Sequence, residues 1–190
     1  MKTKNELIQE IVEIELEMFL TVPTQEKANC QNYPDSFRLH RKAQFNTWSE
    51  ATLESYLNDL NRAKDNDVNL MTIKYARMDN LIPKEKHNPL IEKIIPIQYQ
   101  WQKEMMEKYP RLMAGARPIS QSDDSFYRIS FETYLRGELE TYSDETLELL
   151  YKDMINKVDK GMNMAEEVYT FLTREMGYGS IEEADRAQRR

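Results

Sequence analysis

The sequence predicts an all-α protein, a single-domain, multi-helix bundle of about eight helices. Three observations lead to this prediction. The 190 residues include only five glycines, apolar residues recur at intervals of three and four, and the apolar–polar alternation of β-strands is nearly absent. A chain of this length can bury a sizeable core as one domain. We therefore expect a helical domain over residues 1–180, followed by a charged tail helix over residues 181–190.

The N-terminal half contains the patterns of four helices. Pro23 should end the first, because proline lacks the amide donor that a helix interior needs. Asp35 and Ser49 are residue types that cap helix N-termini, and the polar run DNDVN separates the third helix from the fourth. The helices predicted in this half cover residues 5–19, residues 36–47, a segment after Ser49 and residues 68–81.

The C-terminal half contains the patterns of five more helical segments. Pro96 should kink or restart the first of them. Ser130, Ser143 and Ser180 stand where N-caps are expected, and Gly161 suits a left-handed C-cap. The segments predicted here cover residues 91–109, residues 131–142, the stretch from Ser143 to Gly161, residues 164–176 and residues 181–190.

Charge and cysteine content narrow the class of protein. The net charge of −7 and the pI near 5.1 argue against non-specific binding to nucleic acid or to an anionic membrane. The first twenty residues contain regularly spaced acidic side chains, unlike the apolar core of a signal peptide. No apolar run approaches the ~20 residues that cross a bilayer. Because Cys30 is the single cysteine, no disulfide forms within the chain. We expect a cytoplasmic protein.

Several charged residues fall on helix faces that are otherwise apolar. A buried charge without a partner costs several kcal/mol, so these side chains should meet one another or a ligand. One interpretation is a structural network of ion pairs that fixes how the helices cross. The other is a polar pocket between helices. The inward-facing charged residues are Glu15, Arg41, Lys74, Arg77 and Glu138.

The pocket interpretation assigns a role to each residue. A carboxylate with a raised pKa would move a proton, a tyrosine would orient that carboxylate, and cations would hold a carboxylate or phosphate of the ligand. The catalytic candidates are Glu15, Glu138 and Tyr75. The ligand-binding candidates are Arg41, Lys74, Arg77 and Arg117, the last in a long irregular loop of the kind that often covers a site.

The leading functional hypothesis is a protein that binds an anionic metabolite, or an acid–base enzyme, with this pocket. One alternative is a non-catalytic module that binds a protein partner or its own copy as a homo-oligomer. A weaker alternative is a metal oxidase with a site made of carboxylates alone, from Glu15, Asp59, Glu104 and Glu138. Only two histidines occur and no Glu-x-x-His motif, so the usual di-iron ligand set is missing. We therefore predict no metal site and name no cofactor, and we interpret Cys30 as a passive thiol, with a nucleophile as the alternative.

Three strings carry a resemblance to a known family. They are CQ at residues 30–31, NLMTIKYARMD at 69–79 and FETYLRGELETYSDETL at 131–147. With them, nearly the whole chain resembles a bacterial family known as domain of unknown function 4125. The resemblance implies a small bacterial cytoplasmic protein. It implies no activity, so no catalytic residue follows from it.

Overall fold

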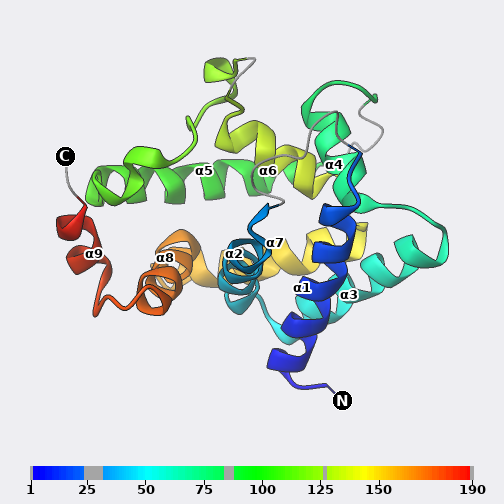
Figure 1. Cartoon of the computed structure of the whole chain (residues 1–190), viewed down its shortest axis with the longest axis horizontal. Coiled ribbons are helices and arrows are strands. Elements are labelled where there is room, and N and C mark those ends of the chain that lie inside the picture. Colours follow the sequence, from blue (N-terminus) through cyan, green and yellow to red (C-terminus); the bar gives the residue numbers. More distant parts are fainter. Residues whose placement is uncertain (1, 24–31, 84–87, 126–127, 189–190) are drawn as a thin grey trace.

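The computed structural model describes residues 2–23, 32–83, 88–125 and 128–188, and Cys30 lies outside these ranges. Within them the chain is α-helical without β-strands (Figure 1), so the predicted fold class is confirmed. Two short 3₁₀ helices, η2 (Leu112–Gly115) and η3 (Gln121–Asp123), precede the sixth α-helix. The nine α-helices of the described residues are α1 (Lys4–Leu20), α2 (Pro34–Asn46), α3 (Glu50–Asp65), α4 (Leu70–Met78), α5 (Ile91–Lys108), α6 (Phe131–Leu139), α7 (Asp144–Asp159), α8 (Met164–Glu175) and α9 (Ile181–Ala187).

Most predicted helix ends are confirmed. The hydroxyls of the four predicted serine caps each accept a hydrogen bond from a backbone N–H one turn into the helix. Gly161 and Gly177 follow α7 and α8 with φ of 65° and 89°, the left-handed backbone that glycine adopts without strain. Pro96 lies inside α5, which continues through it instead of restarting. Local residue types therefore determine where most helices begin and end.

Three predicted helices have clearly different bounds in the structure. The second begins at Pro34, because the fixed φ of proline suits the first helical position, and Asp35 lies inside it rather than capping it. The fourth covers only Leu70–Met78. The Asn69 side chain caps its start, and Asn80, two residues after its end, has a left-handed φ of 54°. The helix predicted over residues 131–142 ends at Leu139.

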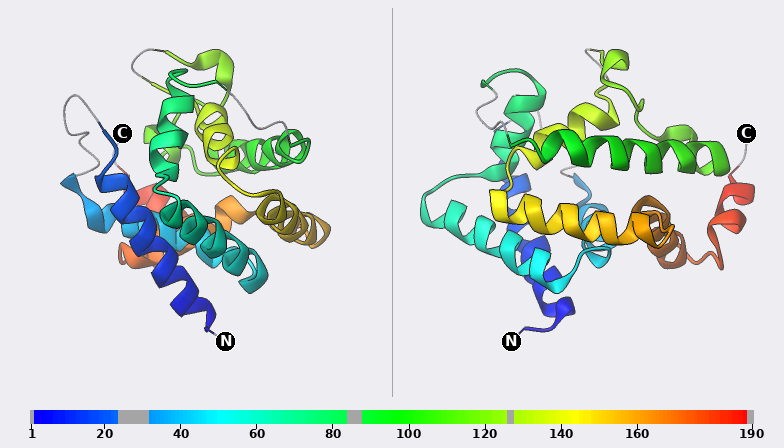
Figure 2. Two further views of the ribbon diagram at one scale, coloured as in Figure 1. Left: turned by 90° about the vertical axis from the view of Figure 1, so that its right-hand side faces the viewer. Right: turned by 180° about the vertical axis from the view of Figure 1, so that it is seen from behind.

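The helices pack around one main core. Helix α1 packs against α2, α3 and α4, and α4 packs against α6. Helix α5 contacts α6, α7 and α8, and it runs beside α7 when the molecule is seen from behind (Figure 2). These contacts bring α1, α2, α4 and α6 together around one interior region.

A second, smaller core lies where α9 meets the end of α5. Met105, Tyr109 and Met113 bury one face of Ile181 there. Burial of about 150 Å² or more of apolar surface by a large side chain contributes several kcal/mol. The division of the chain at residue 180 stays a prediction. Among the described residues, no helix has both the length and the apolar character needed to cross a membrane.

Candidate functional site

Four charged side chains from four helices meet in the protein interior. Glu15 comes from α1, Arg41 from α2, Lys74 from α4 and Glu138 from α6, and none is more than 5% exposed. Arg41 donates from Nε and Nη2 to the two Glu15 oxygens at 2.6 and 2.5 Å. Its Nη1 donates to Oε1 of Glu138 at 2.9 Å, and Lys74 Nζ donates to Oε2 of Glu138 at 2.7 Å. The structure therefore brings these four predicted residues together as one ion cluster.

Neutral polar groups complete the hydrogen bonding of this ion cluster. Tyr56 Oη donates to Glu15 and Tyr142 Oη donates to Glu138, each at 2.6 Å. Gln44 Nε2 donates to Oε1 of Glu138 at 3.1 Å. Each carboxylate thus accepts from a guanidinium and a tyrosine at once. Such saturation is what a buried structural ion pair requires, and the catalytic roles assigned to Glu15 and Glu138 stay predictions.

The ion cluster keeps Glu138 and Lys74 charged at neutral pH. Burial alone would raise the pKa of Glu138, but the charges of Arg41 and Lys74 outweigh burial and hold that pKa well below its usual value of 4.5. Burial alone would lower the pKa of Lys74, but Glu138 raises it above 10.5. Burial and the Glu138 charge both raise the pKa of Tyr142 well above 10. An ionised Glu138 with these partners is a weak base.

We expect the free energy of unfolding to be nearly constant between about pH 6 and pH 9 and to fall on either side. The folded-state pKa of Glu138 lies below 4.5, so its contribution is present above pH 4.5 and is lost as the pH falls through the folded value. The folded-state pKa values of Lys74 and Tyr142 lie above 10.5 and 10.0. Their contributions are present below those values and are lost as the pH rises further. Urea titrations between about pH 3 and pH 11 measure this profile, and a steep change between pH 6 and 9 would contradict it.

Tyr75 and Arg117 each contact an aromatic ring. Tyr75 is half-buried against Phe19, with ring centroids 6.2 Å apart. The guanidinium of the exposed Arg117 lies 4.8 Å from the ring centroid of Tyr134. Lys74 Nζ lies 3.7 Å from the same ring, so Tyr134 makes cation–π contacts with both cations. The roles predicted for Tyr75 and Arg117 stay predictions.

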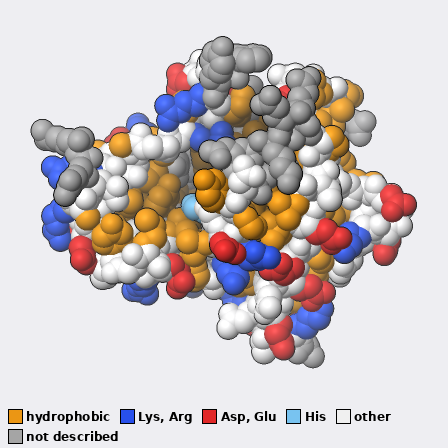
Figure 3. Space-filling view, in the orientation of Figure 1, with side chains coloured by type: hydrophobic (Ala, Val, Ile, Leu, Met, Phe, Trp, Pro, Cys, Tyr) orange, Lys and Arg blue, Asp and Glu red, His pale blue; other side chains and the backbone are white. Residues whose placement is uncertain are grey.

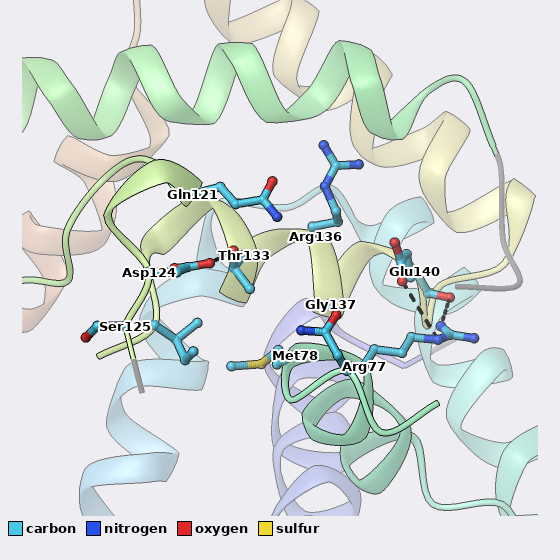
Figure 4. Close-up of a pocket in the computed structure, with 11 residues that line it drawn as sticks. Arg77, Met78, Gln121, Asp124, Ser125, Thr133, Arg136, Gly137 and Glu140 are labelled. Carbon is cyan, nitrogen blue, oxygen red and sulfur yellow. Dashed lines mark hydrogen bonds and ion pairs between the residues drawn. The ribbon is translucent and has the colours of Figure 1, made fainter. Parts of the chain in front are cut away.

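A polar pocket of about 300 Å³ lies beside the ion cluster, between the end of α4, one face of α6 and four residues that precede α6 (Figure 4). These four residues are Gln121, Asp124, Ser125 and Ile129. Its volume is at the small end of the range for ligand pockets. Of the seven predicted site residues, only Arg77 lines it. The charged lining residues are Arg77, Asp124, Arg136 and Glu140. The neutral polar lining residues are Asn80, Gln121, Ser125 and Thr133.

Two local features shape the pocket wall. Gly137 lets α6 approach α4 closely, since a Cβ atom there would lie 2.8 Å from Cγ of Met78. Asp124 accepts from the backbone N–H of Ser130 at 2.6 Å and from Oγ1 of Thr133 at 2.5 Å. These hydrogen bonds tie the segment before α6 to its first turn. Both acceptor oxygens of Asp124 are therefore already occupied by the protein.

The two arginines of the pocket differ in their partners. Arg136 donates to both oxygens of Glu92, at 2.5 and 3.1 Å, and Glu92 is 67% exposed. Arg77 donates from Nη1 to the backbone oxygen of Glu140 at 2.7 Å. Its Nε lies 3.8 Å from Oε2 of Glu140, too far for a hydrogen bond. Arg77 Nε and Glu140 Oε2 are both buried without a hydrogen bond, which is unfavourable. This corner of the pocket therefore lacks a group that bonds to them.

Sequence reasoning missed most of these pocket residues. Gly137 gave one signal, because a glycine inside a helix is unfavourable without a packing reason. Gln121 begins the short 3₁₀ helix η3 and Asp124 follows it, and no apolar periodicity there assigns a direction to either side chain. Among the described residues, no group of three or more His, Cys, Asp or Glu side chains is placed to hold a metal ion. The alternative of a carboxylate-bound metal oxidase, drawn from Glu15, Asp59, Glu104 and Glu138, gains no support there.

Comparison with known proteins identifies a family for this chain but no activity. Searches of curated proteins and of solved structures found no match to this chain. A family model described as a protein of unknown function (DUF4125) matches residues 5–186, nearly the whole length. The chain therefore belongs to the DUF4125 family of proteins of unknown function.

Proposed function

We propose that the protein binds a small anionic molecule in the pocket between α4 and α6. The observation that carries the proposal is that Arg77 and Arg136 both line one polar cavity. Guanidinium groups bind carboxylates and phosphates through two parallel hydrogen bonds. The neutral amide and hydroxyl side chains of the lining would orient the rest of such a ligand.

The electrostatic balance of the pocket favours an anion. Asp124 already accepts two hydrogen bonds, and Glu140 is turned toward Arg77 in Figure 4. The ion pair between Arg136 and Glu92 is exposed on the Glu92 side, and such pairs contribute only about 0–1 kcal/mol. A ligand carboxylate could therefore replace or join Glu92 at Arg136 at small cost.

The ion cluster supports this pocket indirectly. Lys74 and Arg77 lie on the same helix, and Glu138 is adjacent to Gly137 in α6. By joining α4 to α6, the Lys74–Glu138 ion pair fixes the two helices from which both arginines project. In this proposal the ion cluster positions the pocket rather than taking part in chemistry.

We expect Arg136→Gln to weaken binding of the anion at least about tenfold, since a hydrogen bond to a charged group contributes about 1.5–3 kcal/mol. A thermal-shift screen with phosphate, malate, citrate and 3-phosphoglycerate identifies a binding anion, and calorimetry then compares the variants. Glu92→Gln is the matched control, because it breaks the same ion pair but keeps the pocket cation. It should bind as well as the wild type or better. Equal binding by Arg136→Gln and the wild type would contradict the proposal, and so would the absence of any binding anion.

A second candidate function is binding of a protein partner. In Figure 3 hydrophobic side chains gather in a hollow between α5 and α8. Exposed apolar surface of this kind often marks an interaction site. Gel filtration with light scattering tests self-association, the simplest form of this function, and a strictly monomeric protein up to about millimolar concentration would rule that form out.

A further inference from the structure

One donor and one acceptor in the pocket wall form an ion pair with each other but make no hydrogen bond. Within the described ranges, Arg77 Nε and Glu140 Oε2 are the buried side-chain polar atoms that make no hydrogen bond. The two side chains are only 9% and 4% exposed, and both line the pocket. Their head groups face each other in Figure 4. Native proteins rarely leave such atoms unsatisfied, so the pair marks a place where a partner group binds.

The spacing of these two atoms restricts the partner group. At 3.8 Å they are too far apart to bond directly, but one atom can lie within hydrogen-bond distance of both. That atom must accept from Arg77 and donate to Glu140. A hydroxyl does both. A carboxylate or phosphate oxygen only accepts and would be repelled by Glu140, and an ammonium group only donates and would be repelled by Arg77.

We infer that the ligand is a hydroxylated acid, with a hydroxyl between Arg77 and Glu140 and its acid group at Arg136. This inference rests on the proposed function, because it assumes that the pocket binds an anion. The neutral lining side chains, Asn80 and Gln121 among them, suit a ligand with further hydroxyls. Carboxylate and phosphate share the required chemistry at Arg136, so hydroxy acids and polyol phosphates are the two forms to compare.

Matched pairs of probes test the hydroxyl directly on the wild-type protein, so no variant has to fold. Calorimetry compares glycerate with propionate, gluconate with hexanoate, and glycerol 3-phosphate with propyl phosphate. We expect the hydroxylated member of at least one pair to bind tenfold or more tightly than its counterpart. The pair with the larger difference in affinity then shows whether the acid group is a carboxylate or a phosphate.

The outcomes separate this inference from the proposed function. Equal affinities within every pair would overturn the hydroxyl site and leave the anion pocket standing. Tighter binding of 6-aminohexanoate than of gluconate would assign the corner to a cation instead and would also overturn it. If no acid of any pair binds, the anion pocket and the hydroxyl site both fail. In the positive case, Glu140→Gln should reduce the preference for the hydroxylated probe at least threefold. Glu17→Gln, an exposed position on α1 that does not line the pocket, should keep it.

Discussion

Replacement of Glu138 by glutamine should lower the free energy of unfolding by about 3–5 kcal/mol, a large part of the stability of a typical domain. Glu138 accepts hydrogen bonds from Arg41, Lys74, Gln44 and Tyr142 in a region almost closed to solvent. A neutral amide removes the negative charge that compensates Lys74. Arg41 keeps Glu15 as its second carboxylate, so Lys74 is the cation left without one.

The matched control is Glu17→Gln, the same substitution on the surface. Glu17 pairs with Lys64 at 3.0 Å, but the two side chains are 66% and 46% exposed. Such a pair contributes about 0–1 kcal/mol. Urea unfolding of both variants at pH 7 gives the comparison. A loss for Glu138→Gln no larger than that for Glu17→Gln would show that the ion cluster does not hold the helices together.

A double variant separates the charge effect from the loss of packing. Lys74→Met alone leaves Glu138 with Arg41, whereas Lys74→Met combined with Glu138→Gln removes both members of one ion pair. We expect the double variant to lose at least about 1 kcal/mol less than the sum of the two single losses, because residues of one network are energetically coupled. Additive losses would contradict a direct interaction between the two side chains.

Helical periodicity was sufficient to predict that the four charged side chains point inward, but not whether they form an ion cluster or line a pocket. The faces of α1, α2, α4 and α6 follow from apolar residues at intervals of three and four, so a charge in register with them had to point inward. Glu15, Arg41, Lys74 and Glu138 were identified in this way. Serine caps likewise predicted where α3, α6 and α7 begin, since each cap uses only neighbouring residues.

The pocket could not be predicted in the same way, because its walls depend on tertiary approach. Arg77 lies three residues after Lys74 and shares its side of α4, yet Lys74 lies in the ion cluster and Arg77 in the pocket. The crossing of α6 over α4 separates the two environments. Glu140 lies just beyond α6, at its C-cap, and Asp124 lies in irregular chain. Neither residue belongs to a helical pattern of apolar residues that would indicate where its side chain points.

That crossing depends on Gly137, and Gly137→Ala should lower the free energy of unfolding by about 1–3 kcal/mol. The added Cβ would lie 2.8 Å from Cγ of Met78 and 3.3 Å from the backbone oxygen of Lys74. Met78 is buried, so its side chain has little room to move. Alanine stabilises a helix interior by up to about 1 kcal/mol relative to glycine. The variant is destabilised only if the steric cost of the added methyl group exceeds this gain.

The ion cluster makes the crowding harder to relieve. Helix α4 could accommodate the methyl group by moving away from α6, but the 2.7 Å bond from Lys74 to Glu138 joins these same helices. Movement would lengthen that bond or displace Met78 into the pocket. Gly137→Ala should therefore also weaken binding of any pocket ligand. Ligand affinity is an independent readout, because a loss of stability alone does not change it at temperatures where the variant is still folded.

Gly115→Ala is the control for the glycine substitution, because no atom lies within 4 Å of a Cβ placed at that position. It should leave stability within about 0.5 kcal/mol of the wild type, as surface substitutions usually do. Met78→Ala should be less harmful in the Gly137→Ala protein than in the wild type, since it removes the atom that the new methyl group meets. If Gly137→Ala instead matches or exceeds wild-type stability, the close approach of α4 and α6 does not depend on the missing side chain, and the pocket wall owes its shape to the Asp124 hydrogen bonds alone.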